Sequence, residues 1–402
     1  MSQDEMKPVE FDENTHPFEY IRLKLQAAYS LEGDGNFTHH HLAAAAAPDS
    51  AVELSPERPS APAMDELNEK EDDSRRPLPP SMEFTYADLN VTFCQEAKKA
   101  AVFLLVIVHS APAHFLNRQL IRQTWANSAW QEKQNFTVLF LMGRSVSEAV
   151  EAKMAEESKE FGDVLQYEDY LDSYRNLTYK NLAGLYFLSR KCPNKAFQFL
   201  LKTDDDMFLY LRPIVSYLRQ EAYCSRFQPL TIMCAEFQRK EIVQRSKSSK
   251  WHVPWALFGE KHYPPYCYGG GYILTNNLVG LLAEAAKGVP YYWIDDVFVT
   301  GFTARQVPNV KHLQLPGQNP IKGFKCDPQC RKKNGRWFIH TLQRVDLLES
   351  YFRPLKKEGL IVDKVVSSCD ITTPAGKGNK ATSTSKFKQL PPRPVKSKTI
   401  TG

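Results

Sequence analysis

The chain has 402 residues, of which 43% are hydrophobic and 24% charged, enough to bury one large domain or two ordinary ones. The net charge is +5 overall, but it is −10 over residues 1–80 and +7 over residues 371–402, which leaves +8 for residues 81–370. This moderately basic middle part suits an anionic small ligand such as a nucleotide. Its cations alternate with acids, so a nucleic-acid groove is disfavoured and no nucleic-acid partner is expected.

The two ends differ from the middle in composition. Residues 1–80 hold 17 acidic and 7 basic residues, and residues 371–402 hold seven basic residues and no acid among Ser, Thr, Pro and Gly. We expect an acidic, largely disordered, stem-like segment over 1–80, a folded domain over 81–370 and a basic disordered tail over 371–402. The N-terminus does not resemble a signal peptide, and the most apolar run, residues 100–108, is too short to span a bilayer. Membrane association is therefore expected only if an anchor precedes this sequence.

The cysteines and glycosylation sequons favour a secretory compartment. There are eight cysteines, and only Cys326 and Cys330 are closely spaced, without the second pair that a zinc site needs. The sequence leaves the disulfide pairing open. Four Asn-x-Thr sequons indicate a secretory lumen, where disulfides persist; they begin at Asn36, Asn90, Asn135 and Asn176.

In chain order, the middle part alternates predicted strands and helices. Residues 100–110, AAVFLLVIVHS, form a continuous apolar run typical of a buried parallel strand. The elements predicted next are a helix over 118–130, strand 135–143, helix 146–161, strand 163–167, a helix from about 172 capped by Asp172 or Ser173, strand 196–206, helix 278–287 and strand 336–340. This order predicts an α/β domain with a mostly parallel sheet covered by helices on both faces.

Three aspartates, Asp204, Asp205 and Asp206, directly follow the apolar run of strand 196–206. Ligands of open α/β sheets collect at the carboxyl ends of the strands, and Mg²⁺ or Mn²⁺ bound to phosphates uses one or two protein carboxylates. A solvated turn or a helix cap explains a bare aspartate triplet at least as well. The apolar Met207-Phe208-Leu209 that follows moderately favours a metal site.

Further motifs each allow a functional and a structural interpretation. Asp295 and Asp296 could supply a general base, since neighbouring carboxylates raise one another's pKa, or could cap a helix. The aromatic and glycine-rich segment 263–274 could approach a ligand or form a tight turn. Arg118 and Arg122 share a helix face and could bind a diphosphate or pair with surface acids. His340 could complete a metal site or be structural.

Six of these stretches, taken in order, resemble the β-1,3-glycosyltransferase family (glycosyltransferase family 31), which includes galactosyltransferases and N-acetylglucosaminyltransferases. They are RQLIRQTWA (118–126), FLMG (140–143), DYLDSYRNLTYKNL (169–182), FLLKTDDDMFLYL (199–211), YPPYCYGGGYIL (263–274) and IDDVFVTG (294–301). The resemblance implies a GT-A fold and an inverting transfer of galactose or an N-acetylhexosamine from a UDP-sugar to the 3-hydroxyl of an acceptor glycan on a glycoprotein or glycolipid.

The resemblance also implies roles for individual residues. Asp296, with Asp295 beside it, matches the catalytic base, and Asp295 stands where the family often has Glu. Asp206 is the expected ligand of Mn²⁺, or of Mg²⁺, with Asp204 and the more loosely matched His340. The residues expected to bind the UDP-sugar are Ser110, Arg118, Arg122, Asp172, Asn176, Lys180, Asp204 and Asp205, and those expected to bind the acceptor are Trp251, Tyr266, Gly270 and Gly271.

The implied location is the lumenal side of the Golgi membrane, although the sequence itself contains no anchor. A non-catalytic glycan-binding or chaperone-like relative is the alternative, and the presence of both Asp206 and Asp296 argues against it. A metal-dependent phosphotransferase is disfavoured because the chain has no Gly-rich phosphate loop. The sequence does not determine which sugar is donated.

Overall fold

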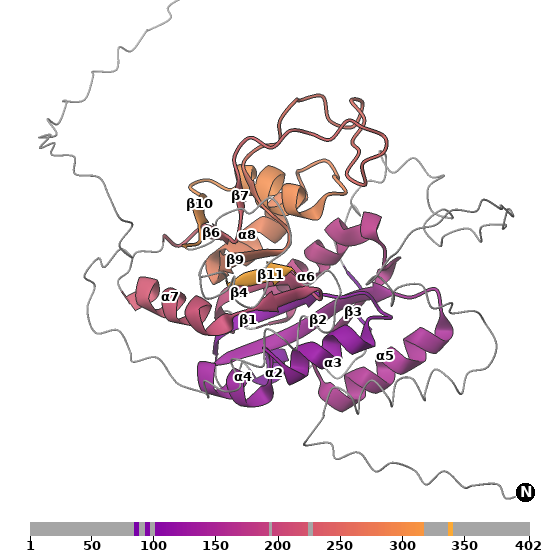
Figure 1. The fold of residues 1–402 in the computed structure, drawn as a ribbon, viewed down its shortest axis with the longest axis vertical. Coiled ribbons are helices and arrows are strands. Elements are labelled where there is room, and N and C mark those ends of the chain that lie inside the picture. Colours follow the sequence, from indigo (N-terminus) through magenta and orange to yellow (C-terminus); the bar gives the residue numbers. More distant parts are fainter. Residues whose placement is uncertain are drawn as a thin grey trace, which may run out of the picture. The chain divides into compact units, whose positions relative to one another are not determined.

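The structure, a computed structural model, describes residues 84–87, 93–96, 101–192, 195–223, 228–316 and 337–340. The expected disordered segments 1–80 and 371–402 lie outside the described residues. The described part contains a seven-stranded sheet in the order β10-β6-β9-β4-β1-β2-β3 (Figure 1). Strands β4, β1, β2 and β3 are mutually parallel, β6 and β10 are parallel to each other, and β9 runs antiparallel to both β4 and β6. The predicted α/β class with a mostly parallel sheet is confirmed.

The elements have the following bounds. The strands of the large sheet are β1 (Val102–His109), β2 (Phe136–Arg144), β3 (Val164–Leu171), β4 (Phe197–Asp204), β6 (Thr231–Cys234), β9 (Gly271–Thr275) and β10 (Lys311–Gln314). Two small antiparallel pairs are β5 (Met207–Leu209) with β11 (Phe338–His340), and β7 (Phe237–Gln238) with β8 (Tyr266–Cys267). The helices are α2 (Phe93–Glu96), α3 (Phe115–Gln123), α4 (Ser128–Gln134), α5 (Glu148–Phe161), α6 (Leu177–Lys191), α7 (Leu211–Tyr223) and α8 (Asn276–Ala286), with short turns η3 (Tyr174–Asn176), η4 (Val297–Thr303) and η5 (Ala304–Gln306).

Helices cover both faces of the sheet, which explains the continuous apolar runs of its strands (Figure 1). Helices α3, α4 and α5 lie on one side, and α6 and α8 lie together on the other. On the second side Leu105 and Ile107 of β1 join a buried cluster with Leu182 of α6 and Leu278 of α8. Burying each such side chain contributes about 1.5–3 kcal/mol to the stability of the fold. This packing holds the strands in place, and with them the edge of the sheet at which they end.

Two local predictions differ from the structure. The helix predicted over 118–130 is broken into α3 and α4, because Asn127 accepts a hydrogen bond from Ala129 N and starts a new helix. The predicted caps at Asp172 or Ser173 are wrong: Ser173 makes no side-chain cap to η3, and Asp172 binds Gly143 N and the Lys180 ammonium instead.

Candidate active site

The predicted nucleotide and metal residues meet at the carboxyl edge of the parallel strands. Ser110 follows β1, Asp172 follows β3, and Asp204 ends β4. In the register of the sheet, His109 lies opposite Asp204 of β4 and opposite Leu141 of β2. The neighbouring strands therefore end together, as expected for a ligand site in an open α/β sheet.

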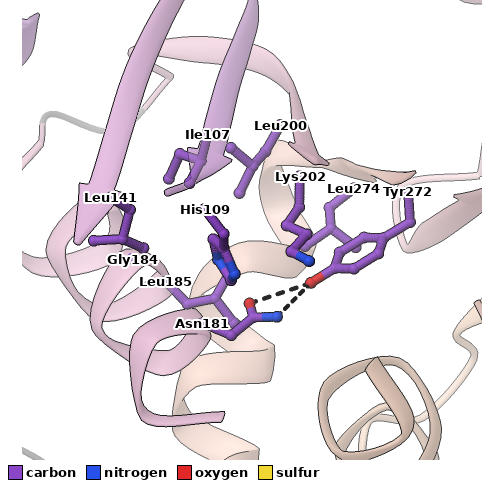
Figure 2. A pocket seen from close by; sticks show the side chains of 10 residues that line it. All are labelled: Ile107, His109, Leu141, Asn181, Gly184, Leu185, Leu200, Lys202, Tyr272 and Leu274. Atoms are coloured by element: carbon purple, nitrogen blue, oxygen red, sulfur yellow. Dashed lines mark hydrogen bonds between the residues drawn. The ribbon is translucent and has the colours of Figure 1, made fainter. Parts of the chain in front are cut away.

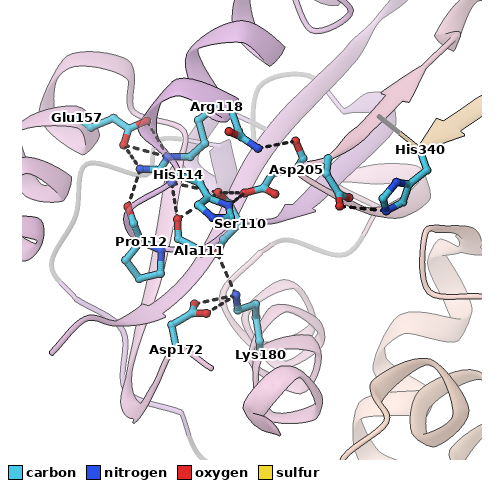
Figure 3. Close-up of polar contacts among 12 residues, drawn as sticks. Ser110, Ala111, Pro112, His114, Arg118, Glu157, Asp172, Lys180, Asp205 and His340 are labelled. Atoms are coloured by element: carbon cyan, nitrogen blue, oxygen red, sulfur yellow. Dashed lines mark hydrogen bonds and ion pairs between the residues drawn. The ribbon is translucent and has the colours of Figure 1, made fainter. Parts of the chain in front are cut away.

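Asp205 is the buried centre of this edge. Its Oδ2 accepts a hydrogen bond of 2.7 Å from Ser110 Oγ and lies 2.8 Å from His114 Nδ1 (Figure 3). The hydrogen bond with Asp205 raises the pKa of His114 above its ordinary value. The sequence interpretation did not include His114, which precedes α3 and approaches Asp205 only because β1 and β4 are adjacent. Asp205 thus holds the loop after β1 against the aspartate triplet.

The two arginines of α3 lie beneath that loop. Arg118 is fully buried, donates to both carboxylate oxygens of Glu157 at 2.6–3.0 Å, and donates to Ser110 Oγ at 3.0 Å (Figure 3). Arg122 binds Glu157 at 2.7 Å and Asp163 at 2.7–2.8 Å. These contacts occupy both guanidinium groups: Arg118 holds the loop after β1, and Arg122 holds Glu157 and Asp163.

Lys180 connects the loop after β1 to Asp172. Its ammonium group donates to Ser110 O at 2.9 Å and pairs with Asp172 at 2.7 Å (Figure 3). The third residue expected here, Asn176, is buried and donates from Nδ2 to Leu171 O at 2.8 Å. Asn176 is therefore inaccessible as a glycosylation site, whereas the other described sequon, at Asn135, is exposed.

Asp206 and His340 come together although they are far apart in the sequence. Strand β11 pairs with β5 so that His340 lies opposite Met207, and His340 Nε2 is 3.0 Å from Asp206 Oδ2 (Figure 3). A carboxylate and an imidazole fit Mn²⁺ when phosphates and water supply its other ligands. Within the described residues, however, no group of three or more His, Cys, Asp or Glu side chains forms a complete metal site.

Lys202 joins the aspartate triplet to the second acidic motif. Its buried ammonium is 2.7 Å from Asp204 Oδ1 and 3.7 Å from Asp295 Oδ2, and it donates to Gly269 O at 2.9 Å. These acidic neighbours raise the pKa of Lys202, although burial opposes the rise. One buried cation thus places residues about ninety positions apart in the same pocket, and the sequence interpretation did not include it.

Asp296 is held by two backbone donors. Gly269 N donates to its Oδ2 at 2.8 Å and Val297 N donates to its Oδ1 at 2.7 Å. Burial, and after it the charge of Asp295, raises the pKa of Asp296 from its ordinary value of 3.8 to about 7. Asp296 caps η4, as one of the two interpretations of the sequence predicted. A carboxylate with this pKa is also suited to accept a proton near neutral pH.

The glycine run, residues 269–271, brings the backbone close to Asp296 and to strand β11. A Cβ at Gly269 would lie 3.2 Å from Asp296 Oδ2, and one at Gly271 would lie 2.4 Å from the ring of Phe338 in β11. Of the residues expected to bind the acceptor, Gly270, Gly271 and Tyr266 are buried and Trp251 is 43% exposed. Trp251 is thus the one of these four whose side chain faces solvent.

A small cavity lies behind Lys202, between β1, β4, β9 and α6 (Figure 2). It has space for about one water molecule. Asn181 and Tyr272 are hydrogen-bonded at its wall, at 2.8 and 3.2 Å, and Asn181 also donates to Asp295 at 2.9 Å. Burial, followed by the charges of Lys202 and Lys180, holds the pKa of His109 well below its ordinary value. The cavity therefore lies next to a neutral histidine and is far too small for a sugar.

Two disulfides stabilise the described part. Cys94 of α2 is bonded to Cys192 after α6, and Cys234 of β6 to Cys267 of β8. Stable disulfides are typical of oxidising compartments. In the part of the chain that the structure describes, no helix is both long enough and apolar enough to cross a bilayer.

Comparison with known proteins identifies the family. A family model described as "Galactosyltransferase" matches residues 116–316, half of the chain. Human "Beta-1,3-galactosyltransferase 5" is 31% identical over 204 residues, 51% of this chain and 63% of that protein. The mouse "Acetylgalactosaminyl-O-glycosyl-glycoprotein beta-1,3-N-acetylglucosaminyltransferase" is 36% identical over 204 residues, 49% of this chain and 50% of that protein.

A solved glycosyltransferase involved in the glycosylation of the major capsid of PBCV-1 is similar over 63% of this chain and 99% of its own, but a TM-score of 0.33 and an identity of 8% are too low to support any conclusion. The aligned segment spans between half and two-thirds of the length of the two curated relatives. All six motifs lie inside the matched residues 116–316. The chain belongs to the galactosyltransferase family, which includes β-1,3-galactosyltransferases and β-1,3-N-acetylglucosaminyltransferases, as the motifs predicted.

Proposed function

We propose that the protein is an inverting glycosyltransferase that moves galactose or an N-acetylhexosamine from a UDP-sugar to the 3-hydroxyl of an acceptor glycan on a glycoprotein or glycolipid. The observation that carries the proposal is the position of Lys202, whose ammonium contacts both Asp204 and Asp295. One buried cation thus joins Asp204, of the proposed metal-binding triplet, to Asp295, the neighbour of the proposed base Asp296. An inverting displacement needs both the metal site and the base, with the leaving group and the base on opposite faces of the anomeric carbon.

Asp296 is the proposed base. Its carboxylate would take the proton of the acceptor hydroxyl as that oxygen attacks the anomeric carbon and the bond to the UDP oxygen breaks. The pKa of about 7 leaves a substantial fraction ionised at neutral pH while keeping the carboxylate basic enough to accept the proton. The backbone donors Gly269 N and Val297 N fix its orientation, and Asp295 tunes its basicity rather than taking the proton itself.

Asp206 and His340 are the proposed protein ligands of Mn²⁺, or of Mg²⁺. The bound ion would offset the charge that develops on the UDP leaving group. Ser110, Asp172, Lys180, Asp204 and Asp205 line the carboxyl edge where the nucleotide would bind, and Arg118 and Arg122 would act indirectly by holding Ser110 and its loop.

The proposed location is the lumen of the Golgi. The disulfides Cys94–Cys192 and Cys234–Cys267 and the exposed sequon at Asn135 are consistent with it. Trp251 would form part of the acceptor site, with Gly270, Gly271 and Tyr266 supporting the pocket from within the fold.

The test is a donor screen with UDP-galactose, UDP-N-acetylglucosamine and UDP-N-acetylgalactosamine, each with Mn²⁺ or with a chelator, followed by linkage analysis of the product. Asp296→Asn should abolish transfer while UDP binding is kept, and Asp206→Ala should weaken metal-dependent UDP binding. Glu284→Gln, on the exposed side of α8, is the matched control and should change neither. Glycan binding without turnover of any donor would support the non-catalytic alternative, and loss of UDP affinity in Asp296→Asn would contradict the assigned roles.

A further inference from the structure

The segment between β7 and β8, residues 239–265, is long and basic. It carries six Arg and Lys residues and two Glu. Five of its cations are exposed: Arg239, Lys240, Lys247, Lys250 and Lys261. Among the residues that the structure describes, no carboxylate lies within ion-pair distance of any of these five. The sixth, Arg245, donates to the carbonyl oxygens of Val253, Phe258 and Glu260, so it shapes the segment from inside. The segment therefore presents a positive surface that the fold itself does not neutralise.

One of these cations lies at the junction of two exposed aromatic rings. The Lys250 ammonium is 4.4 Å from the centre of the Trp251 ring and 5.6 Å from that of Tyr174. Tyr174 is 45% exposed and Trp251 43% exposed. Attraction to aromatic faces within about 6 Å restrains a lysine ammonium. We call Tyr174, Lys250 and Trp251 the rim cluster.

The rim cluster borders the proposed base. The Tyr174 ring lies 6.0 Å from the ring of Trp293, two residues before Asp295, and the Arg175 guanidinium lies 4.0 Å from the same Trp293 ring. Partial burial raises the pKa of Tyr174 to about 12, and the charges of Asp295, Asp296 and Asp204 add to the rise. Tyr174 is thus within electrostatic range of the acidic pocket, with the cations Lys250 and Arg175 beside it.

The cations of the rim cluster and the nearby aspartates bear on whether the acceptor glycan is neutral or anionic. The acidic cluster of Asp204, Asp295 and Asp296 contains one buried cation, Lys202, and an anionic acceptor that approaches this cluster gains from further cations at its edge. A neutral glycan gains only stacking on Trp251 and Tyr174, and it leaves the exposed lysines without a role. A lysine held over aromatic rings and paired with no carboxylate of the described residues is suited to an anionic group of the ligand.

We propose that the acceptor is an acidic glycan, whose carboxylate or sulfate group binds Lys250 at the rim cluster while its reacting hydroxyl reaches Asp296. The inference rests on the proposed transferase function only where it says that the reacting hydroxyl reaches Asp296. Recognition of an acidic glycan by Lys250, Trp251 and Tyr174 is a binding property that can be measured without turnover.

The first experiment is direct titration of the full chain with three oligosaccharides of equal length: a neutral one, one with a uronic acid, and one with a sulfate ester. We expect each acidic ligand to bind up to about fivefold more tightly than the neutral one, the effect of one well-placed partly exposed ion pair. The preference should shrink between low and high salt, because exposed charges are screened. The comparison of the two acidic ligands identifies which anionic group is recognised.

Lys250→Gln should remove most of this preference and Lys250→Arg should keep part of it. The matched control is Lys287→Gln, a partly exposed lysine at the end of α8 that pairs with Glu284, and it should bind all three ligands as the unsubstituted chain does. Thermal unfolding of each variant establishes that it is folded. Equal affinity for neutral and acidic glycans, or an equal loss for both in Lys250→Gln, would overturn the inference.

The second experiment repeats the comparison with kcat/KM for transfer, using the donor found active in the screen. A preference for the acidic acceptors that resides mainly in KM supports the inference. Transfer without such a preference overturns it and leaves the transferase function intact. Binding preference without any transfer supports the rim cluster as an acidic-glycan site and instead contradicts the proposed transferase function.

Discussion

Two substitutions beside Asp296 should move the pH dependence of transfer in opposite directions. Asp295 raises the pKa of Asp296 and Lys202 lowers it, while burial makes the largest contribution to its value of about 7. In the proposed mechanism, transfer requires the ionised carboxylate of Asp296, so kcat/KM of the unsubstituted protein should rise with pH through about 7. Asp295→Asn should shift that rise to lower pH, and Lys202→Met should shift it to higher pH.

The expected magnitude follows from Coulomb's law at a representative separation of two charges. Two unit charges about 8 Å apart at an effective dielectric constant of about 20 interact by about 2 kcal/mol, which corresponds to more than one pH unit. We therefore expect each substitution to move the midpoint by about one pH unit. Lys202→Met also leaves Asp204 and Asp295 without their buried cation, which should destabilise the fold by about 3–5 kcal/mol.

The assay is kcat/KM between pH 5 and 9, at saturating Mn²⁺ and at a temperature where both variants are folded by circular dichroism. Asp295→Asn should retain the hydrogen bond from Asn181 Nδ2, now accepted by the amide oxygen, so it isolates the charge. The reasoning is refuted if both midpoints move in the same direction, or if neither moves by more than the error of the profile.

The remaining predictions concern the metal site, stability and the disulfide. His340→Ala should weaken Mn²⁺-dependent UDP binding, measured by calorimetry, by at least the roughly 10- to 100-fold typical of changes around a metal; unchanged affinity would exclude His340 as a ligand. Folding raises the pKa of Asp296 from 3.8 to about 7, so its stabilising contribution is present below about pH 4 and lost as the pH rises through 7. The Tm of Asp296→Asn minus that of the unsubstituted protein should therefore increase from pH 4 to pH 8, and equal pH dependence of the two values would contradict this. Replacing Cys94 and Cys192 together by Ser opens a loop of 98 residues and should lower the free energy of unfolding by about 2–5 kcal/mol in a denaturant titration; an unchanged value would show that α2 is held by other contacts.

The order of elements was predictable because the buried parallel strands have no polar face. The run that became β1 is apolar without interruption, those that became β2 and β4 are interrupted near their start by Thr137 and Gln198, and each run ends in polar residues. The rule that ligands collect at such ends then placed Asp204 at the site. The break between α3, which ends at Gln123, and α4 was not predicted because the local cap at Asn127, which starts α4, is its main signal.

The partners of the site residues were less predictable than the residues themselves. Lys202 follows the apolar Leu200 and Leu201 in β4, and its position gives no sign that Asp295 and Gly269 O will approach it together with Asp204. His114 approaches Asp205 only through the pairing of β1 with β4. Contacts between residues about ninety positions apart follow from topology, which local sequence patterns do not specify.

The glycine run connects the parts of the site more directly than any side chain does. Gly269 donates its N–H to Asp296 and offers its carbonyl oxygen to Lys202, and Gly270 O accepts from Thr203 beside the aspartate triplet. Gly271 lies against Phe338, the first residue of the strand that ends at His340. A Cβ at Gly271 would meet that ring at 2.4 Å, so β11 and with it His340 would have to move away from Asp206. The three glycines thus contact the proposed base, the buried cation and the strand of the proposed metal ligand, and a small displacement of this backbone should change all three at once.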